Sequence, residues 1–318
     1  MGGALDPAVA KARNLIADNL ADLGPGSSVV AAVSGGADSL ALAAALAFVA
    51  RKEGWLATSI VIDHGLQHDS SQVAANAAGT VRTLGIEADV VAVDVGTDGG
   101  PESAARTARY GALDAIEGAD AVLLGHTLDD QAETVLLGLS RGSGPRSISG
   151  MAPVAGRYRR PFLSMARSET EQVCRASGLK WWVDPHNSDP AYRRVRIRHE
   201  VLPLLENVLG PRINASLART AELVRADSNY LDALAEDQAG SLTVGHLAGL
   251  PGPIRSRVLR LAALEAGVSA SELSAHHLRQ VDELIMKWRG QKVVELPGGI
   301  VAARLGDALS FGPNPVTP

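Results

Sequence analysis

The stretch that decides the fold is residues 28–39, SVVAAVSGGADS. Its first six residues are small and β-branched apolar residues for the most part, which is typical of a buried strand. Two glycines follow, and an Ala- and Leu-rich run then continues to about Lys52 with the composition of a helix. A strand, a glycine turn and a helix in this order predict the first unit of an α/β fold.

The same alternation continues along the chain. Uniformly apolar strands separated by helices are typical of a parallel sheet that helices cover on both faces. We therefore predict the α/β class, with a smaller and mainly helical C-terminal domain. The further strands are expected at 58–64, 88–95 and 120–126, and the helices that follow the last three strands end near 84, 117 and 139.

The composition and patterning of the sequence change after residue 141. Residues 157–200 are rich in arginine, and helical patterns follow to about residue 289, before a tail with the look of short strands joined by glycine turns. We place the domain boundary near Pro211. The prediction is a nucleotide-binding catalytic domain over residues 1–210 and a small helical domain over residues 211–318.

Composition limits the classes of protein. The chain has 318 residues, of which 46% are hydrophobic and 20% charged, as in ordinary globular proteins. The net charge of −5 argues against indiscriminate binding to nucleic acid, although a local basic patch can still hold RNA. Cys174 is the single cysteine, so no internal disulfide forms. The longest apolar run, 40–50, is about half of a membrane crossing. These features predict a cytoplasmic protein without a membrane segment.

The glycine turn has the features of a phosphate-binding loop. Glycines let backbone N–H groups approach an anion at a helix N-terminus, and the flanking serine hydroxyls add hydrogen bonds. A carboxylate at Asp38 would repel phosphate unless Mg²⁺ lay between them, so Asp38 is the predicted metal ligand. An ordinary strand-to-helix turn with a polar cap is the alternative. The predicted nucleotide-binding residues are Ser34, Gly35, Gly36, Ala37, Asp38 and Ser39.

This loop resembles the signature of the PP-loop ATP-pyrophosphatases, which adenylate a substrate (the adenine nucleotide alpha hydrolase-like fold). No G-x-x-x-x-G-K-[ST] string occurs, which disfavours γ-phosphate transfer. Further segments resemble, in order, the motifs of the tRNA(Ile)-lysidine synthetases. They are 63–66 DHGL, 102–110 ESAARTARY, 125–134 GHTLDDQAET, 139–145 LSRGSGP, 160–163 RPFL and 182–203 WVDPHNSDPAYRRVRIRHEVLP.

The resemblance implies a definite reaction. ATP adenylates the C2 oxygen of the wobble cytidine in isoleucine tRNA with a CAU anticodon. The ε-amine of free L-lysine then attacks C2, giving lysidine, AMP and pyrophosphate and changing decoding from AUG to AUA. The implied co-substrate is ATP with Mg²⁺, and related enzymes form homodimers.

Two acids in the fourth strand–helix unit are candidates for handling lysine. Asp130 and Glu133 fall on one helical face, where they can hold an ammonium group or accept its proton. Asp129 and His126 lie just before them, next to the expected nucleotide site, with Asp129 a candidate substrate contact and His126 a candidate nucleotide contact. The alternative is that Asp129 and Asp130 only cap the helix.

Arginines supply the remaining candidates. Arg106 is the predicted catalytic cation by family resemblance, and Arg109 is left open between a site role and a solvated face. Two arginine clusters, 157–167 and 193–198, can contact RNA or form structural ion pairs. The predicted RNA contacts are Arg160, Arg194 and Arg198.

The sequence departs from the family pattern at His186 and Val195, where Ser and Asn are usual, which puts local lysine or RNA contacts in question. Two other functions compete. A thiolase-like PP-loop enzyme is disfavoured by the single cysteine, and a nucleotide sensor without catalysis is disfavoured by the converging carboxylates.

Overall fold

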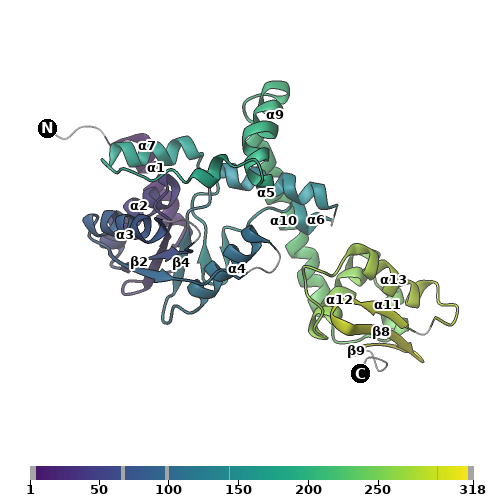
Figure 1. The fold of residues 1–318 in the computed structure, drawn as a ribbon. Helices are drawn as coiled ribbons and strands as arrows, with labels where there is room; N and C mark the ends of the chain where they lie inside the picture. The colour runs from purple at the N-terminus through teal and green to yellow at the C-terminus, as the bar shows by residue number, and fades with distance from the viewer. Residues whose placement is uncertain (1–4, 66–68, 97–99, 143, 292, 314–318) are drawn as a thin grey trace. The chain divides into compact units, whose positions relative to one another are not determined.

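The computed structural model describes residues 5–65, 69–96, 100–142, 144–291 and 293–313 (Figure 1). Backbone contacts divide the chain into two compact units, Met1–Leu137 with Gly150–Arg219, and Gly138–Ser149 with Thr220–Pro318. The predicted boundary near residue 211 stays a prediction, because the contacts also assign an internal segment to the second unit. Among the described residues, no helix has both the length and the apolar character that a membrane span requires.

The first unit contains a six-stranded sheet in the order β3-β2-β1-β4-β6-β5. All neighbouring pairs are parallel except β5 with β6. This mostly parallel sheet confirms the predicted fold class. The strands are β1 (Ser28–Val33), β2 (Leu56–Asp63), β3 (Glu87–Ala92), β4 (Ala121–Leu124), β5 (Val154–Ala155) and β6 (Tyr158–Arg159).

Helices cover both faces of this sheet, as the uniformly apolar strands predict. Val29 and Ala31 of β1 belong to a core shared with residues of α1 (Pro7–Asn19), α2 (Ala37–Glu53), α3 (Ser70–Thr83) and α7 (Arg167–Ala176). Val30 points to the opposite face, where it joins a smaller core that includes Leu113 of α4 (Pro101–Asp114). This alternation along one strand is the geometric consequence of the two-residue period of β structure. Figure 1 shows the two helical layers.

The strand order creates a crevice where a ligand can bind. The chain runs outward from β1 through β2 to β3, and then returns to place β4 on the other side of β1. In open α/β sheets such a reversal leaves a crevice at the carboxyl ends of the two central strands. The phosphate loop follows β1, and α5 (Leu128–Arg141) follows β4, so both lie at this crevice.

The remaining elements of the first unit follow the sheet in the sequence. They are η1 (Pro185–Ser188), α8 (Arg193–Arg196), a π-helical turn η2 (Ile197–Val201) and α9 (Leu202–Leu209), and the long α10 (Ile213–Gln238) begins next. The α8–α9 region begins in the arginine-rich segment and continues into the helical pattern predicted after it.

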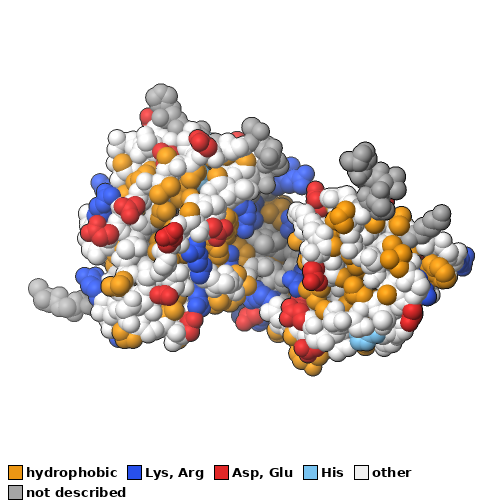
Figure 2. All heavy atoms as spheres, turned by 90° about the horizontal axis from the view of Figure 1, so that it is seen from below, with side chains coloured by type: hydrophobic (Ala, Val, Ile, Leu, Met, Phe, Trp, Pro, Cys, Tyr) orange, Lys and Arg blue, Asp and Glu red, His pale blue; other side chains and the backbone are white. Residues whose placement is uncertain are grey.

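The second unit has its own core. Leu259 and Leu284 are fully buried in it, and a three-stranded antiparallel sheet in the order β7-β8-β9 closes it. Figure 2 shows acidic and basic side chains intermixed on the surface in view. The elements of the second unit are α6 (Pro145–Ile148), α11 (Val244–Gly249), α12 (Gly252–Glu265), α13 (Ala275–Met286), β7 (Val293–Leu296), η3 (Pro297–Gly299), β8 (Ile300–Leu305) and β9 (Ala308–Pro313).

Candidate active site

The phosphate loop is held in shape by its two serines. The Ser34 N–H donates to Ser39 Oγ at 3.1 Å, and Ser39 Oγ donates to the Gly36 carbonyl at 3.0 Å. Gly35 has a φ of +84°, a backbone conformation that favours glycine. Gly36 is the N-cap of α2 and has no side chain to accept from the first helical amides. These amides are therefore positioned to bind an anion.

Two other segments fix the loop from the sides. A Cβ atom at Gly125, the residue after β4, would lie 3.2 Å from the backbone of Asp38 and Ser39, which is tighter than ordinary contact, so glycine favours this close approach. On the other side, the Trp182 N–H donates to the Gly35 carbonyl at 2.9 Å. No local sequence pattern predicts this contact, because Gly35 and Trp182 lie far apart in the chain.

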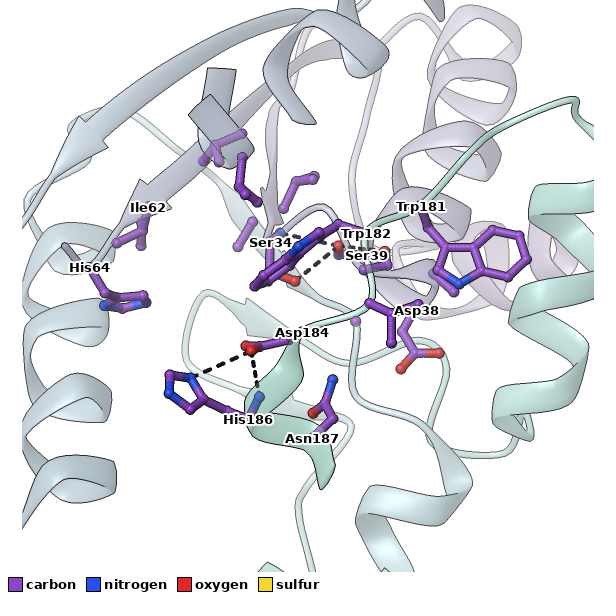
Figure 3. A pocket seen from close by; sticks show the side chains of 18 of the residues that line it. Ser34, Asp38, Ser39, Ile62, His64, Trp181, Trp182, Asp184, His186 and Asn187 are labelled. Atoms are coloured by element: carbon purple, nitrogen blue, oxygen red, sulfur yellow. Dashed lines mark hydrogen bonds and ion pairs between the residues drawn. The ribbon is translucent and has the colours of Figure 1, made fainter. Parts of the chain in front are cut away.

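A cavity of about 630 Å³ opens beside the loop (Figure 3). Ser34 and Asp38 lie on its phosphate-loop side, and Trp182 and His186 come from the segment before and within η1. The volume lies within the range typical of small-ligand pockets, about 300–1,000 Å³. Space for a nucleotide therefore adjoins the anion-binding amides.

His186, the first departure from the family pattern, lines this cavity. Its backbone N–H donates to Asp184 Oδ1 at 2.9 Å, and its ring Nδ1 lies 3.4 Å from the same oxygen, as the dashed lines in Figure 3 indicate. Val195, the second departure, is buried, with 8% of its surface exposed. The first departure thus changes the cavity wall, and the second changes packing.

Asp38 is held by two residues of α7. Its Oδ2 lies 3.3 Å from Arg167 Nε, and its Oδ1 accepts a hydrogen bond from the Thr170 hydroxyl. Burial raises the pKa of this carboxyl above its ordinary value, against the opposing effects of Arg167 and Thr170. No group of three or more His, Cys, Asp or Glu side chains among the described residues is arranged to hold a metal. A lone carboxylate suits Mg²⁺ that also binds substrate phosphates, so Asp38 fits that arrangement.

Asp130 is the most heavily hydrogen-bonded acid of the site. Its Oδ2 accepts from the backbone N–H and the hydroxyl of Thr127 at 2.8 and 2.9 Å. Its Oδ1 lies 3.1 Å from Arg167 and 3.4 Å from Arg198. Burial by itself would raise the pKa of Asp130, but Arg167 and the Thr127 hydrogen bond outweigh it and hold the pKa below its ordinary value. Asp130 therefore both caps α5 and presents a stable negative charge.

Glu133, one turn further along α5, has a fully buried side chain. Its Oε1 accepts from Arg198 Nε at 2.7 Å, and its Oε2 lies 3.7 Å from Arg194. Burial raises the pKa of Glu133, although the Arg198 hydrogen bond works in the opposite direction. The structure thus brings together the predicted lysine-handling acids and two of the predicted RNA-contacting arginines in one network.

Asp129 has a different partner from its neighbour. Its Oδ2 accepts from the backbone N–H of Arg167 at 2.9 Å, and its Oδ1 lies 3.5 Å from Asn214 Nδ2. A carboxylate in this position caps the N-terminus of α7. Asp129 therefore makes a capping contact, as in the alternative interpretation, but the helix that it caps is α7 and not α5, to which it belongs.

His126 lines the cavity at the start of α5. Its Nδ1 is buried and accepts or donates no hydrogen bond among the described residues. Burial lowers the pKa of His126 to about 4, with Arg160 and Arg109 acting in the same direction and Asp130 against it. The ring is therefore neutral at pH 7 and can offer a hydrogen bond to a bound ligand.

The α4 arginines divide between the cavity and the helix surface. Arg109, which the sequence analysis left open, lines the cavity. Arg106, the candidate favoured by family resemblance, is exposed and stacks on the Tyr110 ring at 4.8 Å, and it is absent from the cavity lining among the described residues. The side chain of Glu102, in the same motif, lies outside the described residues, as do Leu66 and Ser143 in two others.

Three arginines of the first cluster, Arg157, Arg159 and Arg160, make contacts within the protein. Arg160 is 8% exposed and donates to the Ala152 carbonyl at 3.0 Å, so its burial leaves almost no surface for the RNA contact predicted for it. Arg157 donates to two carbonyls of the α4 region, and Arg159 pairs with Asp22 at 2.5 Å. These contacts correspond to the structural alternative.

Fold and site together define a PP-loop ATP-utilising protein. A family model described as the PP-loop domain matches residues 7–205, and one described as the TilS substrate binding domain matches residues 242–308. The tRNA(Ile)-lysidine synthase of Thermobifida fusca (strain YX) is 52% identical over 303 residues, covering 92% of this chain and 94% of that protein. The chain belongs to the tRNA(Ile)-lysidine synthase family.

Other relatives extend this comparison. The tRNA(Ile)-lysidine synthase of Salinispora tropica is 47% identical and covers 98% of both chains. Among solved structures, the U34-tRNA thiolase NcsA from Methanococcus maripaludis has a TM-score of 0.59 with 20% identity, over 69% of this chain and 80% of that one. That likeness concerns the fold alone.

Proposed function

We propose that this chain is a carbon–nitrogen ligase that converts the wobble cytidine of isoleucine tRNA with a CAU anticodon to lysidine. The C2 oxygen attacks the α-phosphate of ATP and releases pyrophosphate. The lysine ε-amine then attacks C2, loses a proton and displaces AMP. The observation that carries the proposal is one cavity that joins the anion-binding loop to a cluster of carboxylates. The names of close sequence relatives of this chain support the same activity.

The phosphate loop supports the first half-reaction. The amides at the start of α2 would bind the phosphates, and Mg²⁺ held by Asp38 would neutralise charge on them when bound. His126, neutral at pH 7, would donate to or accept from the nucleotide. Arg109 lines the same cavity and would stabilise charge that develops on phosphate, a role for which a guanidinium is suited.

The carboxylates on α5 support the second half-reaction. Asp130 keeps its negative charge and suits an ammonium group, whereas the raised pKa of Glu133 suits a group that accepts a proton. Both acids now contact Arg198, so lysine would compete with this guanidinium for them. Arg194 and Arg198 would then bind RNA phosphates. We also propose that the second unit contacts the tRNA. A homodimer stays a prediction.

A thiolase is less compatible with this chain. The solved structure with a similar fold holds a [4Fe-4S] cluster, a group that cysteine thiolates normally bind. The present sequence has a single cysteine, Cys174, which is buried with its thiol directed to the Ala37 carbonyl at 3.3 Å. Burial raises the pKa of this thiol to about 12, so it is not a ready nucleophile.

The deciding experiment is AMP release with ATP, Mg²⁺ and a CAU-anticodon isoleucine tRNA transcript, with and without labelled L-lysine. We expect incorporation of lysine into the RNA in proportion to AMP released. A transcript with a UAU anticodon, which lacks the target cytidine, is the control. AMP release without incorporation of lysine would retain ATP cleavage and discard the lysidine product.

A further inference from the structure

One guanidinium at the site contacts acids from two different elements. Arg167, the first residue of α7, places Nε 3.3 Å from Asp38 of the phosphate loop and Nη2 3.1 Å from Asp130 of α5. Its backbone N–H donates to Asp129 at 2.9 Å, which fixes the start of the helix. The side chain lines the cavity and is 27% exposed. Arg167 therefore bridges the predicted metal ligand and the predicted lysine contact.

This position conflicts with a divalent cation on Asp38. Mg²⁺ requires direct contact with a carboxylate oxygen at about 2.1 Å. Thr170 already donates to Oδ1 of Asp38, and Arg167 takes Oδ2. Arginine stays protonated at every pH of interest, so it cannot give way by losing its charge. It can give way only by moving.

We propose that Arg167 is a positioning residue that holds Asp38 and Asp130 in place until a divalent cation displaces it from Asp38. The inference rests on the proposed function only in taking Asp38 as the metal ligand. Arg167 keeps its second anchor on Asp130 when it leaves Asp38, so it remains in the cavity beside the bound nucleotide. The arrival of the cation thus leaves Arg167 bound to Asp130 alone, and this shared side chain couples the two halves of the site.

The charges of the network support this role. Asp38, Asp129, Asp130 and Glu133 carry four negative charges, and Arg167, Arg194 and Arg198 carry three positive ones. Removal of the Arg167 charge leaves one more uncompensated negative charge and frees an oxygen of Asp38. Each change favours a divalent cation. A merely structural arginine would have the opposite effect, because its loss would disorder the ligand.

The test measures binding of Mn²⁺ to the full-length protein by electron paramagnetic resonance, with no nucleotide, lysine or RNA present. We expect Arg167→Met to bind Mn²⁺ at least about tenfold more tightly than wild type, as the loss of one charge-assisted hydrogen bond would give. Arg167→Lys should lie between them, since an ammonium is a point charge that cannot reproduce the two-armed contact. Arg196→Met is the matched control, because Arg196 is an exposed arginine that pairs with Glu200 at 2.9 Å, and neither of these two is among the described residues that line the cavity. This variant should bind Mn²⁺ as wild type does.

The double variant Arg167→Met/Asp38→Asn should lose the gain, which locates it on Asp38. Unchanged or weaker Mn²⁺ binding by Arg167→Met would overturn the inference. If circular dichroism shows that this variant is unfolded, Arg167→Lys decides alone, and binding no tighter than wild type rejects the idea. Wild type that incorporates no lysine, with the Mn²⁺ result as expected, would reject the proposed function alone. Active wild type without the Mn²⁺ effect would reject the inference alone.

Discussion

At the residue scale, the acids of the site differ in protonation because their partners differ. Burial raises the pKa of Asp38 and of Glu133, whereas Thr127 and the surrounding arginines keep the pKa of Asp130 below its ordinary value in spite of burial. Neighbouring carboxyls with separated pKa values are suited to different tasks. Asp130 is thus the better electrostatic anchor and Glu133 the better proton acceptor, a division that the sequence alone left open.

His126 makes stability depend on pH. Its folded-state pKa of about 4 lies below its ordinary value of 6.5, so the unfolded chain binds a proton first as the pH falls. Stability contributed by the neutral ring is full above pH 6.5 and is lost as the pH falls toward 4. At about 1.4 kcal/mol per unit, the ceiling is about 3 kcal/mol. We expect His126→Gln to lose less stability than wild type between pH 7.5 and 5.0, measured by urea unfolding.

The control for this prediction is His276→Gln, a substitution of an exposed histidine in the second unit. It should keep the pH dependence of wild type. The same pH dependence in His126→Gln and wild type would show that His126 is not the group responsible.

The role of Arg167 shows where sequence reasoning stops at this scale. Its position within an arginine-rich segment suggested an RNA contact or an unspecified ion pair. Its actual partners, Asp38 and Asp130, lie 129 and 37 positions away. Periodicity and spacing report neighbours within a helix or strand, and contacts of this range depend on how the sheet is wound. By contrast, the phosphate loop was predictable, because its glycines, serines and helix start are contiguous.

At the scale of elements, the strong periodic signals gave correct strands and helices. The strand predicted over the first six residues of 28–39 corresponds to β1, and the helix predicted to end near 139 corresponds to α5, which ends at Arg141. The weak signals failed: β5 and β6 have two residues each, too few to show a period. Helix α1 buries only Val9, Ala12 and Ile16, so its apolar pattern is weak. The clearest sign of this helix in the sequence is Asp6, whose side chain caps it.

The close approach between the end of β4 and the phosphate loop leads to a prediction about nucleotide binding. In Gly125→Ala, the new methyl group would lie 3.2 Å from the backbone of Asp38 and Ser39, which is tighter than ordinary contact. The loop must shift, so we expect the Kd for an ATP analogue to rise about fivefold or more, since the loss of one hydrogen bond is worth about 1 kcal/mol or more. Titration calorimetry of the purified variant measures it.

Gly79→Ala is the matched control. Gly79 lies within α3, and a Cβ there would meet nothing within 4 Å. Alanine is the better helix former by about 1 kcal/mol, so this variant should be slightly more stable and bind the analogue as wild type does. Equal binding by both variants would contradict the idea that the close approach at Gly125 shapes the loop.

At the scale of the whole molecule, each unit has a separate hydrophobic core. Leu46 lies in the core beside the parallel sheet, and Leu259 lies in the core of the second unit, each fully buried. The cavity is lined by residues of the first unit among those described. Nucleotide binding is therefore expected to depend on the first core, whereas productive turnover on tRNA is proposed to need both.

Matched core substitutions test this separation. Leu259→Ala removes buried methyl groups from the second core and should destabilise that unit by about 2–5 kcal/mol, while Leu46→Ala should do the same to the first. Three of the four tryptophans, Trp55, Trp181 and Trp182, lie in the first unit, so their fluorescence during urea unfolding reports mainly on it, and circular dichroism reports on both. We expect Leu259→Ala to lower the urea midpoint of the circular dichroism transition and to leave the fluorescence midpoint close to that of wild type. The Kd for an ATP analogue should be unchanged, whereas lysine incorporation should fall. Equal shifts of both probes, together with weaker analogue binding, would mean that the two cores unfold as one cooperative unit and that nucleotide binding draws on both.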